Sequence, residues 1–375
     1  MRVLLASNFP RDDRLGSVRT PLRLEPELVS LGVSVRSVYA DELPQRPGGR
    51  AGALSAPLRM AVAVRSLGAD ADVVDIAGGD GVAYFGYARR WRPRQALVAR
   101  SNGLWDLALA GDDPAGRTRV RSLLSGIYQR NTLCRWEQGA IRRADMAVFL
   151  SECDAREVVR RGWRTAETTV AVNPAVDGFF AAEKPLAARR DVAFVGTFFH
   201  RKGSDVVTSV MSRLLIERPE LGLTLFGVGM LPEAARAHFD ERVRPRVTVV
   251  PSVSAEELGR RLGEFALFLF PTRYEGFGIV VLEAMRAGLA VVTTPTGAGA
   301  DLIRDGQNGL IVPVGDVAAT LAAVTRLLDD APLRERLAAA AVDDSRGRTW
   351  RRAAEQLVTV YEQALRGARD RAGLG

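Results

Sequence analysis

Short apolar segments alternate with stretches of helical periodicity along this chain, and that alternation limits the fold more than any other feature of the sequence. In the first half the apolar segments are RVLLAS, ADVVDIAGG, QALVARSNG and ADMAVFLS, and each ends in small or polar residues. Strands that alternate with helices imply a parallel sheet with helices on both faces. We therefore predict an α/β fold with a doubly wound, Rossmann-like first domain.

A second series of the same kind follows a stretch rich in Pro, Ala and charge, VAVNPAVDGFFAAEKPLAARR, which is typical of a linker. Its apolar segments are DVAFVGTF, GLTLFGVG, RVTVVPSV, FALFLFPT and AVVTTPTG. A chain of 375 residues is long enough for two cores of ordinary size. We expect Rossmann-like domains at residues 1–185 and 186–349, and a C-terminal helix within 350–375 that packs back across the junction.

Composition narrows the class of protein. With 47% hydrophobic and 26% charged residues the chain reads as globular, and no apolar run approaches the length of a membrane-spanning helix. The first apolar run is too short for a signal peptide, so we expect a cytoplasmic location. Cys134 and Cys153 show no metal-ligand spacing, and both are interpreted as buried or inert thiols.

The basic residues are almost all arginine, since Lys184 and Lys202 are the only lysines among 52. That bias indicates a GC-rich genome. Arginines interleave with aromatic residues in YARRWRPRQ and in residues 117–143, a pattern that suits an anionic membrane surface at the inner face of the membrane or an acidic acceptor. The alternative is a solvated face of ordinary helices. No nucleic-acid motif accompanies the charge.

The stretch RYEGFGIVVLEAMRAG carries two glutamates, Glu275 and Glu283, eight positions apart. It is predicted to form a glycine-bearing turn after a buried strand, followed by a helix that begins near Gly278. Such a turn exposes N–H groups at the positive end of the helix, where a phosphate is stabilised. Apolar neighbours predict that Glu283 is buried, and a buried carboxylate requires partners, such as a ribose diol.

A second segment, FVGTFFHRKGSDVV, predicts a strand, Gly196, a short loop and a helix. The loop holds Arg201 and Lys202, whose charges suit a diphosphate. Two surface cations in a loop are the default interpretation of this segment alone. Because both segments follow strands of one predicted domain, where ligands of open parallel sheets bind, we predict a shared diphosphate-sugar site.

These motifs together resemble the retaining glycosyltransferases of family 4. The resemblance rests on the Glu275 and Glu283 pair, EGFG, FVGTFFHRKG, LFGVG, EAMRAGLAVVTTPTGAGADLIRDGQNGLIVP, and TW followed by Tyr361. It covers residues 190–366 strongly and the first half weakly. It implies the GT-B fold, with two Rossmann-like domains facing across a cleft, a nucleotide-sugar donor, no metal or cofactor, and a place in bacterial glycan biosynthesis.

The resemblance also implies roles for individual residues. Arg201 and Lys202 would hold the donor diphosphate, Glu283 the ribose, and Glu275 the transferred sugar. The other implied donor contacts are Gly16, Asn102, Gly196, Val253, Gly276, Phe277, Gly278 and Ile279. The acceptor would be a sugar, a lipid-linked molecule or a small molecule, and the first domain would bind it. Retention favours a front-face displacement, with Glu275 as a covalent nucleophile the lower-ranked alternative.

Two positions depart from the family pattern. Thr197 stands where many relatives carry an arginine, and Asn102 stands where they often carry a histidine. A catalytically weak or inactive nucleotide-sugar-binding relative that acts as a partner protein is therefore an open alternative. A membrane-associated binding module and a nicotinamide oxidoreductase are two others, and the latter is weak because GVGMLP holds only two of the three required glycines.

Overall fold

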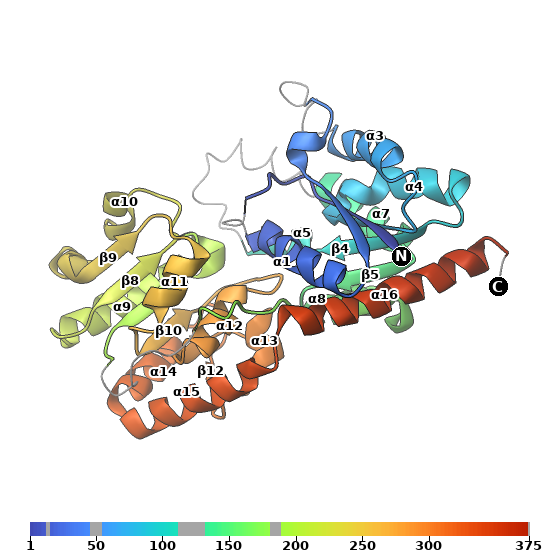
Figure 1. The fold of residues 1–375 in the computed structure, drawn as a ribbon. Coiled ribbons are helices and arrows are strands. Elements are labelled where there is room, and N and C mark those ends of the chain that lie inside the picture. The colour runs from blue at the N-terminus through green and yellow to red at the C-terminus, as the bar shows by residue number, and fades with distance from the viewer. Residues whose placement is uncertain (13–15, 46–54, 112–131, 181–188, 374–375) are drawn as a thin grey trace. The chain divides into compact units, whose positions relative to one another are not determined.

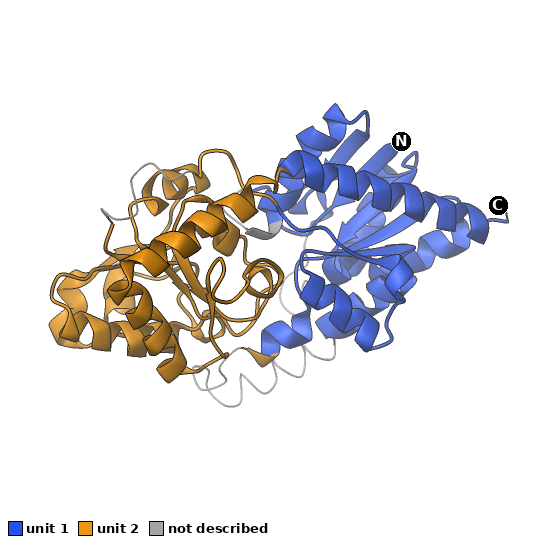
Figure 2. Cartoon of the chain, turned by 90° about the horizontal axis from the view of Figure 1, so that it is seen from below, with its two compact units in different colours: residues 1–109, 114–174, 350–375 blue, residues 110–113, 175–349 orange. Residues whose placement is uncertain are grey.

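The computed structural model describes residues 1–12, 16–45, 55–111, 132–180 and 189–373. They form two compact units, which Figure 2 shows in different colours. Unit 1 comprises residues 1–109, 114–174 and 350–375, and unit 2 comprises residues 110–113 and 175–349. None of the helices in these described ranges is long and apolar enough to cross a membrane.

Unit 1 is built on a six-stranded parallel sheet in the order β2-β1-β3-β4-β5-β6 (Figure 1). The strands are β1 (Arg2–Ala6), β2 (Ser34–Val38), β3 (Val73–Ala77), β4 (Ala96–Ser101), β5 (Met146–Phe149) and β6 (Thr169–Ala171). Every residue of β3, β4 and β5 is buried, as expected for strands covered on both faces. The doubly wound prediction for this half is confirmed.

The helices of unit 1 form two groups. Helices α3, α4 and α7 pack together, and α1 packs on α16, which also lies against β3, β4 and β5. Their bounds are α1 (Gly16–Ser30), α3 (Ala56–Leu67), α4 (Val82–Trp91), α5 (Trp105–Ala110), α7 (Cys134–Arg143), α8 (Glu152–Arg160) and α16 (Trp350–Arg371), and the short 3-10 turns are η1 (Ala40–Glu42), η2 (Gly78–Gly81) and η5 (Ala166–Thr168).

A buried ionic cluster fixes the C-terminal helix α16 to the sheet of unit 1. The Tyr361 hydroxyl donates to Asp75 Oδ2 at 2.9 Å, and Arg100 Nε donates to Asp75 Oδ1 at 3.1 Å. All three side chains are at most 3% exposed. Burial and the Asp75 charge raise the pKa of Tyr361 well above its usual value, so its proton stays available for this bond.

Unit 2 repeats the architecture, with a parallel sheet in the order β12-β11-β10-β7-β8-β9 (Figure 1). The strands are β7 (Val192–Val195), β8 (Leu223–Phe226), β9 (Val247–Val250), β10 (Leu267–Phe270), β11 (Ala290–Thr293) and β12 (Leu310–Ile311). The helices are α9 (Ser204–Glu217), α10 (Pro232–Arg236), α11 (Ala255–Leu262), α12 (Ile279–Arg286), α13 (Ala298–Leu302), α14 (Val317–Asp329) and α15 (Ala331–Arg346), with 3-10 turns η7 (His200–Lys202) and η8 (Glu241–Arg246).

The predicted linker needs one correction. Val170 and Ala171, its first two residues, belong to strand β6, which pairs with β5 and closes the sheet of unit 1. This strand has only three residues, all partly exposed, so it lacks the apolar signal of the others. The units divide between residues 174 and 175, whereas the sequence placed the junction near 185, and residues 181–188 lie outside the described part.

Candidate active site

The sheet of unit 2 has a topological switch point between β7 and β10. From β7 the chain runs outward through β8 and β9, then returns to β10 on the other side of β7 and continues to β11 and β12. Open α/β sheets bind ligands outside the carboxyl ends of the strands at such a switch point. The segment that carries Lys202 follows β7, and the segment that carries Glu275 follows β10.

Hydrogen bonds tie these two loops together at the switch point. The Arg273 amide donates to the Arg201 carbonyl at 2.7 Å, and the Thr272 hydroxyl donates to the same oxygen at 3.0 Å. Thr294, at the end of β11, donates to the Thr272 carbonyl at 2.6 Å. Three adjacent strand ends thus hold one another in place.

Gly203 allows the close approach of the loops. Its φ of +78° is disfavoured for residues with a side chain, and a Cβ at this position would lie 2.1 Å from the Pro271 carbonyl oxygen. Glycine is therefore required after Lys202 for steric reasons. It also begins helix α9, since it is the residue that precedes Ser204.

An ion pair between Lys202 and Glu275 lies at the centre of the candidate site. Lys202 Nζ donates to Glu275 Oε1, and the two side chains are 18% and 10% exposed. Thr272 Oγ1 lies 3.4 Å from the same carboxylate oxygen, and the Phe270 ring lies 5.5 Å from the ammonium group. These two charges, which were predicted to share one site at strand ends of this domain, are thus in direct contact, and the remaining exposure leaves them accessible.

A second ion pair braces the loop that contains Arg201 and Lys202. Arg273 donates to both carboxylate oxygens of Asp205, each at 2.7 Å, and to the His200 carbonyl at 2.8 Å. Burial raises the pKa of Asp205, whereas the hydrogen bonds and the charge of Arg273 lower it. The lowering effects together are larger, so the net shift of the pKa is downward. The Arg201 guanidinium lies 5.2 Å from the Phe199 ring. Such bracing limits the motion of the loop.

Helix α12 begins at Ile279, directly after Gly278, as predicted. Gly278 adopts a φ of +80°, which turns the chain from the loop into the helix. The turn is clamped from the β11 side, because the Ala298 amide donates to the Phe277 carbonyl at 2.5 Å and a Cβ on Gly297 would lie 2.3 Å from that oxygen. This geometry holds the amino end of α12 beside Glu275.

Glu283 lies on α12 and is 1% exposed, so the predicted burial is confirmed. The other predicted contacts in unit 2 lie at carboxyl ends of the same sheet. Gly196 directly follows β7 with a φ of +134°, Val253 follows β9 and is half-buried, and Gly276 and Phe277 are buried in the loop before α12. The structure thus gathers these residues at one edge of the unit 2 sheet.

Gly16 and Asn102 belong to unit 1. Gly16 is the first residue of α1, and Asn102 directly follows β4. Asn102 thus lies at the carboxyl end of a strand of the unit 1 sheet.

One acidic residue near Asn102 was missed in the sequence. Glu137, on α7, is 2% exposed and accepts hydrogen bonds from the Ser101 hydroxyl at 3.1 Å and the Trp105 amide at 2.9 Å. Burial raises the pKa of Glu137 to about 8, and these hydrogen bonds act in the opposite direction. The sequence held a signal for this burial, since Glu137 is three and four positions from the apolar residues Ala140 and Ile141 and therefore shares their face of the helix.

Among the residues that the structure describes, no group of three or more His, Cys, Asp or Glu side chains could hold a metal ion. Neither Cys134 nor Cys153 forms a disulfide bond with another described residue, and each is half-buried.

Comparison with known proteins identifies the family. Residues 189–330 match the family model described as glycosyl transferases group 1. The chain is 32% identical over 275 residues to the lipopolysaccharide core biosynthesis mannosyltransferase LpsB of Rhizobium meliloti strain 1021, covering 67% of this chain and 74% of that protein. It is 29% identical over 260 residues to a D-inositol 3-phosphate glycosyltransferase of Nocardioides sp., covering 62% of this chain.

The chain spans 57% of the length of that second relative. Among solved structures, it is similar to the sucrose-phosphate synthase from Thermosynechococcus elongatus, with a TM-score of 0.77 at 18% identity over 97% of this chain and 99% of that one. The similarity extends over both sheets and shows the two-domain GT-B fold. The chain therefore belongs to the family of group 1 glycosyl transferases and has the GT-B fold.

Proposed function

We propose that this protein transfers a hexosyl residue from a nucleotide-sugar donor to an acceptor hydroxyl, with retention of anomeric configuration and without a metal ion. Family membership supports glycosyl transfer, and the name of the mannosyltransferase relative supports a hexose. The observation that carries the proposal is the Lys202–Glu275 pair at the switch point of unit 2. It combines a cation suited to a diphosphate with a carboxylate suited to sugar hydroxyls.

In the proposed reaction, the bond between the anomeric carbon and the diphosphate oxygen breaks as the acceptor oxygen bonds to the same face of that carbon. The acceptor proton passes to the departing diphosphate. Lys202 and Arg201 would stabilise the charge that develops on the diphosphate, which makes a metal ion unnecessary. Glu275 would orient the sugar through its hydroxyls.

The ion pair also argues against Glu275 as a covalent nucleophile. Lys202 already donates to one carboxylate oxygen, and Thr272 Oγ1 lies within 3.4 Å of the same atom. The hydrogen bond from Lys202 stabilises the ionised carboxylate and so reduces its reactivity toward the anomeric carbon. We therefore favour the front-face displacement.

Glu283 would bind the ribose, since it lies on α12, the helix whose amino end follows Glu275. The backbone of Gly276, Phe277, Gly278 and Ile279 would meet the diphosphate at that helix end, and Gly196 would allow its close approach after β7. Val253, after β9, would meet the base. Gly16 and Asn102 would complete the donor contacts from unit 1, which would also bind the acceptor.

A relative that binds nucleotide sugars without transferring them is the competing proposal, because Thr197 and Asn102 depart from the family pattern. Two measurements separate the proposals. A thermal-shift screen with UDP, GDP, ADP and TDP sugars should raise the melting temperature for one nucleotide, since a ligand that binds only the folded protein stabilises it. Release of free nucleoside diphosphate from that donor supports transfer, whereas a thermal shift without release supports the binding protein.

We also propose that unit 1 contacts an anionic membrane at the cytoplasmic face, where a lipid-linked acceptor would be available. Helices α3 and α4 contain no Asp or Glu, and their exposed residues mix cations with large apolar side chains. Leu58, Val62 and Trp91 are 65%, 61% and 64% exposed. This composition suits anionic headgroups above an apolar layer.

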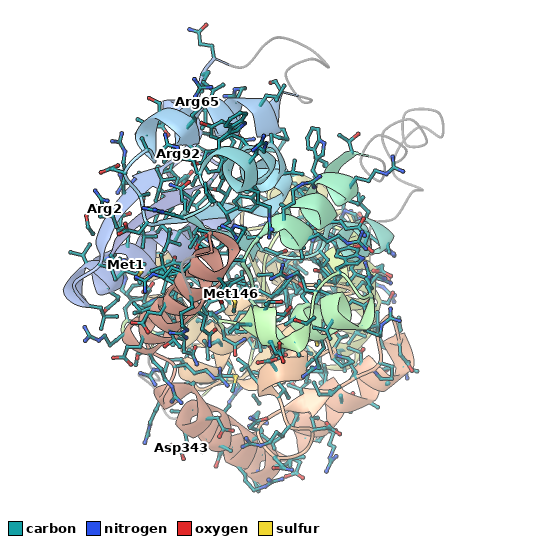
Figure 3. The ribbon with its side chains drawn as sticks, turned by 90° about the vertical axis from the view of Figure 1, so that its right-hand side faces the viewer. Met1, Arg2, Arg65, Arg92, Met146 and Asp343 are labelled. Atoms are coloured by element: carbon teal, nitrogen blue, oxygen red, sulfur yellow. The ribbon has the colours of Figure 1, made fainter. Side chains whose placement is uncertain are left out.

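Helices α3 and α4 pack against each other, and we call their exposed residues the α3–α4 face. On α3, Leu58, Val62 and Arg65 follow helical spacing and therefore share a side of the helix. The Arg65 guanidinium lies 5.8 Å from the ring of Tyr87 on α4, which joins the two helices (Arg65 is labelled in Figure 3). On α4, Arg90 lies over the Trp91 ring at 5.0 Å.

Only part of the predicted basic surface can be described. Arg89, Arg90 and Trp91 are exposed, as are the arginines of α7, but residues 117–131 lie outside the described part of the chain. Liposome flotation tests the proposal. The protein should float with anionic vesicles at low salt and be released at high salt, and the Leu58→Ser/Val62→Ser variant should float less. Equal flotation with neutral and anionic vesicles would contradict the proposal and show that these residues form an ordinary solvated face.

A further inference from the structure

A buried carboxylate lies directly beneath the loop that carries Asn102. Glu137 extends from α7 to the carboxyl end of β4, where it accepts from the Ser101 hydroxyl and the Trp105 amide at 3.1 and 2.9 Å. These two donors flank the loop on either side of Asn102. The Gly103 amide in turn donates to the Ser101 hydroxyl at 3.3 Å, so the loop is bonded to Glu137 at two points and braced internally through Ser101.

The position of Glu137 is set by close backbone packing. Turn η2, after β3, approaches α7 so closely that a Cβ on Gly79 would lie 2.7 Å from the Glu137 amide nitrogen. A Cβ on Gly139, two residues further along α7, would lie 2.8 Å from Val82 at the start of α4. Two glycines therefore let α7 contact η2 and α4 directly, and this rigid packing holds Glu137 under the loop.

The surroundings of Glu137 are acidic, which makes a carboxylate an unfavourable choice for packing alone. Asp154 on α8 and Asp106 on α5 both raise the pKa of Glu137, although burial is the larger cause. Asp106 is itself paired with Arg161 at 2.5 Å. Retaining an acid among these groups is costly unless its hydrogen bonds perform a function.

We propose that Glu137 is a positioning residue, which fixes the Ser101–Trp105 loop and thereby orients Asn102 toward a hydroxyl of the transferred sugar. This proposal rests on the proposed glycosyl transfer. Glu137 would not touch the substrate. It would act by limiting the conformations of the loop, so that Asn102 is already placed when the donor binds.

Two substitutions separate positioning from general packing. In Glu137→Gln the amide keeps the size of the side chain, and its oxygen can still accept from Trp105 while its nitrogen donates to the Ser101 hydroxyl. In Glu137→Ala both contacts are lost. We expect kcat to fall about tenfold or more in the Ala variant, in line with the loss of both hydrogen bonds that hold the loop, and to stay within about twofold in the Gln variant.

Hydrogen exchange measured by mass spectrometry provides a readout that does not depend on the reaction. The Trp105 amide should exchange at least about tenfold faster in Glu137→Ala than in the wild type, and at a near-wild-type rate in Glu137→Gln. Glu362→Ala serves as the control, since Glu362 is an exposed glutamate on α16. Unchanged exchange of residues 101–109 in the Ala variant would overturn the proposal.

A double-mutant cycle with Asn102→Ala identifies the route by which Glu137 acts. If Glu137 works through Asn102, the combined Asn102→Ala/Glu137→Ala variant should be no more than about twofold slower than the worse single variant. Additive losses, or a Gln variant as slow as the Ala variant, would contradict the proposal. If the wild type releases no nucleoside diphosphate at all, glycosyl transfer fails while the exchange experiment still tests the position of the loop.

Discussion

Replacement of Lys202 by Met should lower turnover on the order of a hundredfold. Methionine keeps most of the apolar stem beside the Phe270 ring and removes the ammonium group that donates to Glu275. In the proposed reaction this group faces the charge that develops on the leaving diphosphate. The loss of one such preorganised contact typically costs about 3 kcal/mol of transition-state stabilisation, which corresponds to that fall in kcat.

The same change affects stability, and the structure indicates by how much. Glu275 is 10% exposed and would lose its cationic partner. Breaking an ion pair at such a site lowers the stability of the protein more than breaking one at the surface and less than breaking a fully buried one. We expect the free energy of unfolding to fall by about 2 kcal/mol. Adding Glu275→Gln should restore much of this stability, because a neutral amide tolerates the site, but it should not restore turnover.

Turnover is measured as nucleoside diphosphate release, and stability by urea denaturation of the same preparations. Arg190→Met is the matched control, since Arg190 is an exposed cation just before β7 in the same unit. Lys184 is a less suitable control, because it lies outside the described residues. The reasoning is refuted if Lys202→Met and Arg190→Met retain similar activity.

Three further outcomes are expected. Glu283→Gln should weaken binding of the free nucleoside diphosphate in calorimetry while Glu275→Gln spares it, because only the former acid is assigned to the ribose, and an equal loss in both would contradict that division. Activity should persist in EDTA, since Lys202 supplies charge at the diphosphate, and loss of activity that magnesium restores would show otherwise. Tyr361→Phe should lower the free energy of unfolding by about 1.5–3 kcal/mol in urea, because it removes a hydrogen bond to the buried Asp75 carboxylate, and a change below about 0.5 kcal/mol would argue against that anchoring role.

The order of strands could be predicted where each strand is a continuous buried run. Strands β7, β8 and β10 are entirely buried, so their apolar segments stand out from the polar loops. Strand β6 was missed because its residues are only partly buried, and β12 because it has two residues. A short or half-exposed strand derives its stability from its neighbours in the sheet, and this contribution has no local signature.

A shared site for Lys202 and Glu275 could also be anticipated, because parallel strands bring their carboxyl ends to one edge of a sheet. The sequence could not show which strands are neighbours. The sheet order makes β7 and β10 adjacent although they are distant in the chain, and only this adjacency brings the two charges into contact. Local patterns thus identified the charged groups, whereas the topology determined their pairing.

Buried polar clusters were the hardest features to foresee. Tyr361 and Asp75 are 286 positions apart in the sequence, and Asp75 interrupts an otherwise apolar strand without any local sign of its partner. Glu137 lies in a segment whose arginines and aromatic residues dominate its pattern. In both cases the partner is supplied by a distant part of the chain, so the single sequence identifies neither hydrogen bond.

The anomeric configuration of the transferred sugar tests the proposed function most directly. With an axial nucleotide-sugar donor and water as the acceptor, proton NMR can observe the released sugar before it mutarotates. Front-face displacement at the Lys202–Glu275 site predicts that the axial anomer appears first in the wild type and that its rate of formation falls about a hundredfold in Lys202→Met. First appearance of the equatorial anomer would contradict the proposed retaining mechanism.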